Sequence, residues 1–175
     1  MPNYVRAYVP GGTYFFTVKL LAHHRQLLTE HIDALRESFR HVKRQRPFRI
    51  NAVVILPDHL HCLWTLPDDD ADYSTRWRLI KSRFSRAIEH GERLSARRHQ
   101  KRERGIWQRR FWEHVIRDQR YFDAHLDYIH YNPVKHGWSS SVAEWPYSSF
   151  HEYVKDGWYP VNWAAPADVQ GVDRE

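Results

Sequence analysis

The spacing of apolar and polar positions along the chain predicts an alternation of strands and helices. Aromatic and β-branched residues fill 13–20 and predict a first strand. Thr29, a typical N-cap residue, precedes apolar positions that recur at helical spacing over 32–42, which predicts a helix ending in a basic run. A second strand is predicted over 48–56, where the last five residues are all apolar.

The next segment continues this pattern with a strand, a helix and a polar stretch. The short Pro57-Asp58 link makes the strand predicted over 59–66 antiparallel to its predecessor. Ser74 opens a helix whose apolar face is made by Trp77, Ile80, Phe84 and Ile88. Residues 91–105 contain almost no apolar side chain and many arginines, which is typical of a mobile loop or of a helix extension that orders on a ligand.

The last predicted elements complete the order. A short strand over 111–117 precedes a helix over 120–131, which we expect to end before Pro133. The first six elements make the split ferredoxin-like pattern, an α+β fold in which an antiparallel sheet carries helices on one face. A C-terminal helix and a tail follow. We expect one domain over 1–163 and a loose tail over 164–175.

Composition narrows the class of protein. With 175 residues, 42% hydrophobic and 27% charged, the chain has the size and balance of one globular domain, which excludes whole-chain disorder. The single cysteine, Cys62, excludes an internal disulfide and a cysteine-based zinc cluster. No apolar stretch reaches the ~18 residues of a membrane span, and the first nine residues lack the layout of a signal peptide. We therefore expect a cytoplasmic protein with no membrane partner.

Positive charge is concentrated in one segment. The chain carries 27 Lys and Arg against 21 Asp and Glu, a formal charge of +6, and residues 76–110 hold 13 of the basic residues but three of the acidic ones. Such a focused patch indicates polyanion binding, and the alternative is a solvated arginine-rich face. The aromatic residues that interleave with this charge are Trp77, Phe84, Trp107, Phe111 and Trp112. They are candidates for stacking on unpaired bases, although several must also belong to the core.

Two histidines are separated by one residue at the start of a predicted strand. Side chains at positions i and i+2 of a strand point to the same face, about 7 Å apart, so His59 and His61 can bind one divalent metal ion. Leu60 and Cys62 then point to the other face, which favours a buried thiol over a metal ligand. The alternative is a pair of surface histidines, because a chain with 13 histidines produces such a triplet readily by chance.

The predicted C-terminal helix offers a second group of polar residues. Tyr128 and Asn132 are four residues apart and share a helix face. A tyrosine on that face is placed to approach a metal-bound phosphate, and the Asn132 oxygen is a candidate third ligand. Tyr121 and Tyr131 are rival nucleophiles. Alternatively, Tyr128 is a packed helix side chain and Asn132 a helix-terminal residue before proline.

Five motifs, taken in order, give the chain a family resemblance. They are Gly11–Val18, Leu56–His61, Phe111–His114, Tyr128–Gly137 and Trp145–Phe150. With these motifs the chain resembles the REP-associated tyrosine transposases, a domesticated branch of the single-tyrosine HUH transposases. The resemblance extends from about Tyr4 to about Trp163, which is most of the chain.

This resemblance implies a ferredoxin-like HUH nuclease core and a single-stranded DNA substrate. That substrate is the hairpin of a repetitive extragenic palindrome (REP), with a short guide sequence at its foot. By position, His59 and His61 match the pair that binds Mg²⁺ or Mn²⁺, and Asn132 stands where relatives place a helix-borne polar ligand. Tyr128 matches the nucleophile, which is expected to attack the scissile phosphorus, form a 5′-phosphotyrosine and release a 3′-hydroxyl.

The same resemblance assigns the basic segment to the DNA backbone. The candidate DNA-binding residues are Arg76, Arg78, Lys81, Arg83, Arg86, Arg109 and Arg110. The stretch 91–105 is longer than the corresponding connection in relatives, and it either binds DNA or is an exposed insertion. Glu113 and His114 match a family motif. Their role is either to orient the site histidines by hydrogen bonding or to pack in the core.

Two other functions stay open on the sequence alone. A hairpin-binding protein with little cleavage, acting in regulation or chromosome organisation, would keep its DNA affinity without Tyr128 or metal and show a steep salt dependence. An RNA-binding ferredoxin-like module would prefer hairpins that carry 2′-hydroxyls. The sequence is compatible with a monomer or a homodimer, and with a nucleoid-associated place in the cytoplasm.

Overall fold

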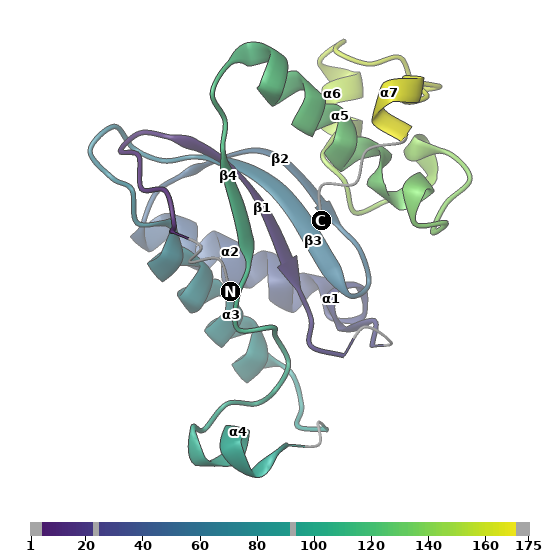
Figure 1. Ribbon diagram of the computed structural model, residues 1–175. Coiled ribbons are helices and arrows are strands. Elements are labelled where there is room, and N and C mark those ends of the chain that lie inside the picture. The colour runs from purple at the N-terminus through teal and green to yellow at the C-terminus, as the bar shows by residue number, and fades with distance from the viewer. Residues whose placement is uncertain (1–4, 23–24, 92–93, 171–175) are drawn as a thin grey trace.

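A four-stranded antiparallel sheet forms the centre of the computed structural model, which describes residues 5–22, 25–91 and 94–170 (Figure 1). The strands are β1 (Thr13–Lys19), β2 (Arg49–Ile55), β3 (His59–Thr65) and β4 (Trp112–Val115). Their order across the sheet is β2-β3-β1-β4, so β1 and β3 are central and β2 and β4 are edges. The predicted α+β class and the antiparallel pairing are confirmed.

Helices cover both faces of this sheet. Helices α2 (Ile32–Gln45) and α3 (Tyr73–Ala87) lie side by side on one face, and α5 (Gln119–Lys135) crosses the other, where the C-terminal segments gather (Figure 1). The shorter helices are α1 (Leu27–Glu30), α4 (Ala96–Gln100), the 3-10 turn η1 (Val142–Glu144), α6 (Phe150–Lys155) and α7 (Ala167–Gln170). The strand–helix–strand units β1-α2-β2 and β3-α3-β4 are each split by a strand between their partners, which is the predicted ferredoxin-like topology.

Alternation along β3 supplies both hydrophobic cores. Cys62 and Trp64 point to the helix pair, where Trp64 stacks on Trp77 of α3 with ring centroids 4.3 Å apart. Leu63 points to the opposite face and belongs to a second core with Ile129 of α5. Full burial of a large apolar side chain contributes about 2 kcal/mol, so a strand buried on both faces is held firmly in register. Burial also raises the pKa of the Cys62 thiol, as expected for a core residue rather than a ligand.

Two helix starts differ from the sequence prediction. Thr29 lies inside the short α1 and its hydroxyl donates to a backbone carbonyl, so it does not cap the long helix α2. Asp72, two residues before Ser74, caps α3, because its carboxylate accepts the backbone N–H of Thr75 at 2.9 Å. In both cases the apolar helix face was predicted. The Thr29 cap was wrong, and the predicted start of α3 at Ser74 is one residue after the observed start at Tyr73.

Helix α5 continues four residues beyond its predicted end at Tyr131. It passes through Pro133, which is buried in the last turn, and ends at Lys135 with His136 as its C-cap. A proline removes one backbone donor and strains the preceding turn. Burial of the inner helix face, which includes Ile129, outweighs this local preference. The extension is important for the site, because it carries Lys135 and His136 onto the helix.

The segments predicted to be mobile or loose have defined structure where they are described. Within 91–105, residues 96–100 form α4, while 92 and 93 lie outside the described residues. In the predicted tail, Ala165 and Val169 are buried and α7 contacts α5. Residues 171–175 also lie outside the described part. Across 5–22, 25–91 and 94–170, no helix combines the length and apolar character needed to span a membrane.

Arg76 is a correction to the predicted DNA contacts. Its side chain is 1% exposed, and its guanidinium donates to the Asp70 carboxylate at 2.7 Å. The same group also donates to the carbonyls of Arg46, Pro47 and Asp72, at 3.1, 2.8 and 2.9 Å. The guanidinium therefore joins α3 to the chain entering β2. It is committed to the protein and does not face a ligand.

The variant Arg76→Gln is expected to lower the free energy of unfolding by about 2–4 kcal/mol, because the half-buried Asp70 carboxylate and three carbonyls lose their buried donor. Arg83→Gln removes the same charge from an exposed position of the same helix and is expected to change stability by less than about 0.5 kcal/mol. Urea unfolding followed by circular dichroism measures both. Equal stability of the two variants would contradict the structural role of Arg76.

Candidate functional site

The two histidines of β3 lie side by side on the sheet face that α5 covers. Within the sheet, His59 pairs with Lys19 of β1, and His61 pairs with Thr17 of β1 and Val54 of β2. The imidazole centroids are 5.0 Å apart, and both side chains are buried. The strand alternation predicted from the sequence thus brings the pair together on one face.

A hydrogen bond to Nδ1 orients each imidazole. The Thr17 hydroxyl lies 2.9 Å from Nδ1 of His61, and the Asp58 carboxylate lies 2.8 Å from Nδ1 of His59. When Nδ1 carries the proton and donates it to such an oxygen, the lone pair is on Nε2, which is the arrangement found in metal-ligating histidines. The Nε2 atoms of both rings are buried. Asp58 and Thr17 are therefore orienting residues that the sequence analysis did not identify.

One face of α5 runs alongside the histidine pair. The ring of Tyr128 lies 5.4 Å from that of His61, and the ring of His136, two turns further on, lies 5.0 Å from that of His59. Asn132 is one helical turn from each of these residues and so lies between the two contacts. The shared face predicted for Tyr128 and Asn132 is therefore directed at the histidines.

The side chain of Asn132 is buried without satisfying its polar atoms. Neither its Oδ1 nor its Nδ2 has a hydrogen-bond partner among the described residues. Burying an unsatisfied amide costs about 1–3 kcal/mol, so this position is expected to serve a ligand. An amide oxygen is an acceptable ligand for Mg²⁺ or Mn²⁺, and imidazole nitrogens can complete the set. Within the described ranges no three His, Cys, Asp or Glu side chains form a metal cluster, so a site here depends on the amide.

Of the three candidate tyrosines, the structure brings Tyr128 to the histidines. Its hydroxyl accepts a hydrogen bond from the Lys135 ammonium at 3.3 Å, and the same ammonium lies 5.0 Å from its ring centroid. Tyr131 lines a separate cavity with Trp163, and Tyr121 packs against His125 with ring centroids 4.3 Å apart. Lys135 was not identified from the sequence, because the helix was predicted to end before it.

The basic segment forms a cavity of about 700 Å³ between α3, α4 and the chain leading to β4, which we call the basic cavity. Four of the predicted DNA-binding residues line it: Arg78, Lys81, Arg86 and Arg109. Two others, Arg83 and Arg110, are exposed at the surface. The Lys81 ammonium donates to the Gln108 carbonyl at 2.7 Å. Burial, assisted by the charge of Arg6, lowers the pKa of Lys81 to about 8.

This cavity is close to the histidine pair. The backbone N–H of Gln108 donates to the carbonyl of Lys19 at 3.0 Å, and Lys19 is the strand partner of His59. Neighbouring strands are about 4.8 Å apart, so Gln108, which contributes to the cavity wall, is roughly 10 Å from His59 across the sheet. The cavity is on the α3 side of the sheet and the histidine pair is on the α5 side, so this separation is a backbone distance across the sheet.

Among the aromatic residues that interleave with the charge, Trp112 is the one with a large exposed ring. Trp77 and Phe84 are fully buried in the helix-side core, and Trp107 is nearly so. Trp112 is 52% exposed and pairs with Thr17, in the cross-strand row that also contains His61. The stacking prediction therefore fits Trp112 and does not fit the buried rings.

The motif around Glu113 and His114 divides between the two sheet faces. Glu113 is buried on the helix side, where its carboxylate pairs with Arg6 and accepts a hydrogen bond from the Tyr73 hydroxyl at 3.2 Å. His114 is on the opposite face and stacks with Phe15 at 6.3 Å. Glu113 thus matches the packing alternative, because the Asp58 and Thr17 oxygens orient the site histidines.

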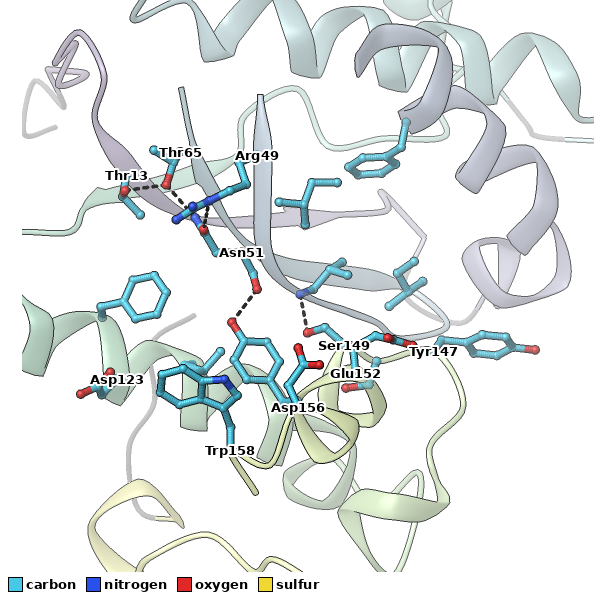
Figure 2. A pocket seen from close by; sticks show the side chains of 18 of the residues that line it. Thr13, Arg49, Asn51, Thr65, Asp123, Tyr147, Ser149, Glu152, Asp156 and Trp158 are labelled. Carbon is cyan, nitrogen blue, oxygen red and sulfur yellow. Dashed lines mark hydrogen bonds between the residues drawn. The ribbon is translucent and has the colours of Figure 1, made fainter. Parts of the chain in front are cut away.

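A larger cavity, of about 1000 Å³, lies at the edge strand β2 (Figure 2). Residues 147–149 run along this edge, and the Ser149 N–H donates to the Val53 carbonyl at 2.8 Å. The Tyr153 hydroxyl donates a hydrogen bond to the Asn51 carbonyl at 2.7 Å. Its lining mixes acidic and basic side chains and includes neither the histidine pair nor the candidate nucleophile. These contacts cover the β2 edge, which would otherwise be open to pairing.

Comparisons with known proteins place the chain in a family. The family model described as IS200-like transposase matches residues 14–132, a range that includes the histidine pair, Tyr128 and Asn132. A REP-associated tyrosine transposase of Escherichia coli K12 is 49% identical over 164 residues, covering 94% of this chain and 92% of that protein. A Haemophilus influenzae protein provisionally given the same name is 45% identical over 171 residues, which is 97% of each chain.

The fold agrees with these matches. A solved structure of the REP-associated tyrosine transposase bound to a REP hairpin matches this chain with a TM-score of 0.82 at 48% identity, covering 95% of this chain and 93% of that one. Sequence and fold therefore lead to one conclusion: the chain belongs to the REP-associated tyrosine transposases, within the IS200-like transposases.

Proposed function

We propose that this protein is a metal-dependent endonuclease and strand transferase for single-stranded DNA that acts on REP hairpins through a 5′-phosphotyrosine on Tyr128. The observation that carries the proposal is the contact of Tyr128 with His61, one helical turn from the unsatisfied amide of Asn132. The hairpin substrate is supported by the solved relative that is bound to a REP hairpin, and by the basic cavity.

His59, His61 and Asn132 would hold the Mg²⁺ or Mn²⁺ ion. When bound, such an ion polarises the scissile phosphate and neutralises the charge that develops on its oxygens. The residues of this chain prepare the site by fixing the orientation of the ligands. Asp58 and Thr17 hold the imidazoles, and the sheet register fixes their separation.

The chemistry is a transesterification. The phenol oxygen of Tyr128 forms a bond to the scissile phosphorus while the bond from phosphorus to the 3′-oxygen breaks. The phenol loses one proton and the departing 3′-oxygen gains one, so the reaction is balanced without a co-reactant. The phosphodiester is retained in the covalent link, and attack by a 3′-hydroxyl on that link rejoins a strand without ATP.

Lys135 assists the nucleophile. Its ammonium donates to the Tyr128 hydroxyl, so a positive charge is next to the oxygen that becomes negative as the proton leaves. Because Lys135 and Tyr128 belong to the same helix, the distance between the two groups is set by α5. We infer that Lys135 positions the phenol and stabilises its ionised form during attack.

The test of the proposal is a covalent-trapping gel with labelled hairpin DNA and Mn²⁺. The wild-type protein is expected to give a slow-migrating band that survives SDS, and Tyr128→Phe and a chelator are each expected to abolish it. Tyr131→Phe is the matched control, because it removes the same hydroxyl from the same helix at a position that lines another cavity.

A band that survives Tyr128→Phe and disappears in Tyr131→Phe would contradict the assignment of the nucleophile. Tight hairpin binding by a folded wild-type protein, with no band from a host REP sequence, would favour the hairpin-binding function instead. Circular dichroism of each variant confirms that the fold is retained.

The variant Lys135→Met is expected to slow covalent trapping by about tenfold to a hundredfold, because the developing phenolate loses its neighbouring charge. Lys135→Arg keeps the charge and should recover part of the rate. Affinity for the hairpin is measured in parallel and should change little. A trapping rate in Lys135→Met that equals the wild-type rate between pH 7 and 9 would contradict the role of Lys135.

Hairpin affinity is expected to depend on pH through Lys81. Its pKa of about 8 means that the ammonium is charged at pH 7 and loses its proton as the pH rises through 8. A nearby phosphate favours the charged form of Lys81. Above pH 8 the Lys81 amine must therefore take up a proton when DNA binds, and the affinity falls by up to about tenfold per pH unit. Fluorescence anisotropy from pH 7 to 9 measures this.

Lys81→Met should weaken binding at pH 7 and make it nearly independent of pH over that range. Lys101→Met, which removes an exposed lysine outside the cavity, should keep the wild-type pH dependence. The same pH dependence in Lys81→Met and in the wild type would show that Lys81 is not the responsible group.

A further inference from the structure

The basic cavity has an unusual charge balance. Among its described lining residues, eight are Arg or Lys and one is acidic, Glu103. Like charges that face one another across a cavity repel, so such a lining is stable only with a counter-anion or with strong external anchoring. The structure provides both.

Anchoring comes from Arg104, at the end of the arginine-rich stretch. Its guanidinium donates to three carbonyls at the end of α3: those of Ser85, Ile88 and Glu89. Carbonyls in the last turn of a helix lack partners within the helix and carry partial negative charge, so an arginine satisfies them well. This contact fixes α4 against α3 and makes it a second wall of the cavity.

The two walls present arginines toward the same space. Arg78 and Arg86 come from α3, and Arg98 and Arg102 come from α4 or its end. Other basic residues of α4, such as Arg97 and Lys101, are exposed and are not among those that line the cavity. Helix α4 therefore has a cavity side and a solvent side with similar charge.

Glu103 supplies the counter-anion. Its carboxylate lies 3.1 Å from Nε of Arg109 and 3.7 Å from a guanidinium nitrogen of Arg98. It thereby joins a residue of the α4 wall to a residue of the chain that leads to β4. A carboxylate between two guanidinium groups occupies the position that a phosphate would take, because arginine binds both anions through the same planar set of donors.

We propose that α3 and α4 form a clamp for backbone phosphates of the DNA substrate, and that Glu103 is a resident counter-ion which a phosphate displaces. This inference rests on the proposed function for the identity of the substrate. It assigns the arginine-rich stretch a binding role.

The first test compares two double variants of α4 that remove the same charge. Arg98→Gln with Arg102→Gln removes two positive charges from the cavity side, and Arg97→Gln with Lys101→Gln removes two from the solvent side. The first pair is expected to weaken binding of REP hairpin DNA by about tenfold or more and to reduce the slope of log affinity against log salt by about two. The second pair is expected to weaken binding by less than about threefold. Equal losses would overturn the clamp and indicate a diffuse charge effect.

The second test is Glu103→Gln, which removes the internal competitor for the arginines. The clamp predicts tighter hairpin binding, by about threefold to tenfold, at unchanged thermal stability. Weaker binding, or a lowered melting temperature without tighter binding, would show that Glu103 only supports the structure and would overturn its role as counter-ion. Inorganic phosphate is the comparison ligand. If inorganic phosphate alone bound at these arginines as tightly as hairpin DNA does, a clamp for a DNA backbone would be contradicted.

These outcomes are separate from those of the proposed function. Covalent trapping depends on Tyr128 and metal, and it is measured at saturating DNA, where a loss of affinity is compensated. If the wild-type protein forms the covalent complex but the two double variants of α4 lose the same DNA affinity, the clamp is rejected and the nuclease is kept. A clamp that behaves as expected, in a protein that forms no covalent complex, would reject the nuclease and keep the DNA-binding surface.

Discussion

The two-residue period of β3 is the constraint on which the rest of the structure depends. One set of its side chains, including Cys62 and Trp64, is committed to the core under α2 and α3. The other set then has no choice of face, and His59 and His61 point toward α5. Because β3 is paired on both sides and buried on both faces, a shift of register would expose the tryptophan core. The geometry of the histidine pair is thus enforced by hydrophobic burial.

Helix α5 places the other candidate site residues next to the histidine pair. Its apolar residues, such as Ile129, seat it on β2 and β3, and the same packing holds Tyr128 and Asn132 over the histidines. Under the proposed function, a bound cation would remove the cost of burying the unsatisfied Asn132 amide. Lys135 follows on the same helix, so α5 carries Tyr128, Asn132 and Lys135 together.

Most of the fold and half of the site follow from sequence patterns. Strand periodicity located the four strands, and the spacing of Tyr128 and Asn132 located one helix face. The burial of Arg76 was predictable from its helical spacing with Tyr73 and Ile80 on the buried face, but its charge indicated an exposed side chain. Lys135 was missed because a local rule about Pro133 was outweighed by burial. Contacts such as Thr17 with His61, which join residues distant in sequence, have no local signal.

The central claim is that Tyr128, held against the histidine pair, is the residue that becomes joined to DNA. Tandem mass spectrometry of the trypsin-digested covalent complex tests it most directly, because one tryptic peptide, residues 121–135, contains all three candidate tyrosines. The account predicts fragment ions that place the nucleotide adduct on Tyr128 alone. An adduct on Tyr131 or Tyr121 would contradict it, since Tyr131 lines a separate cavity and Tyr121 packs against His125.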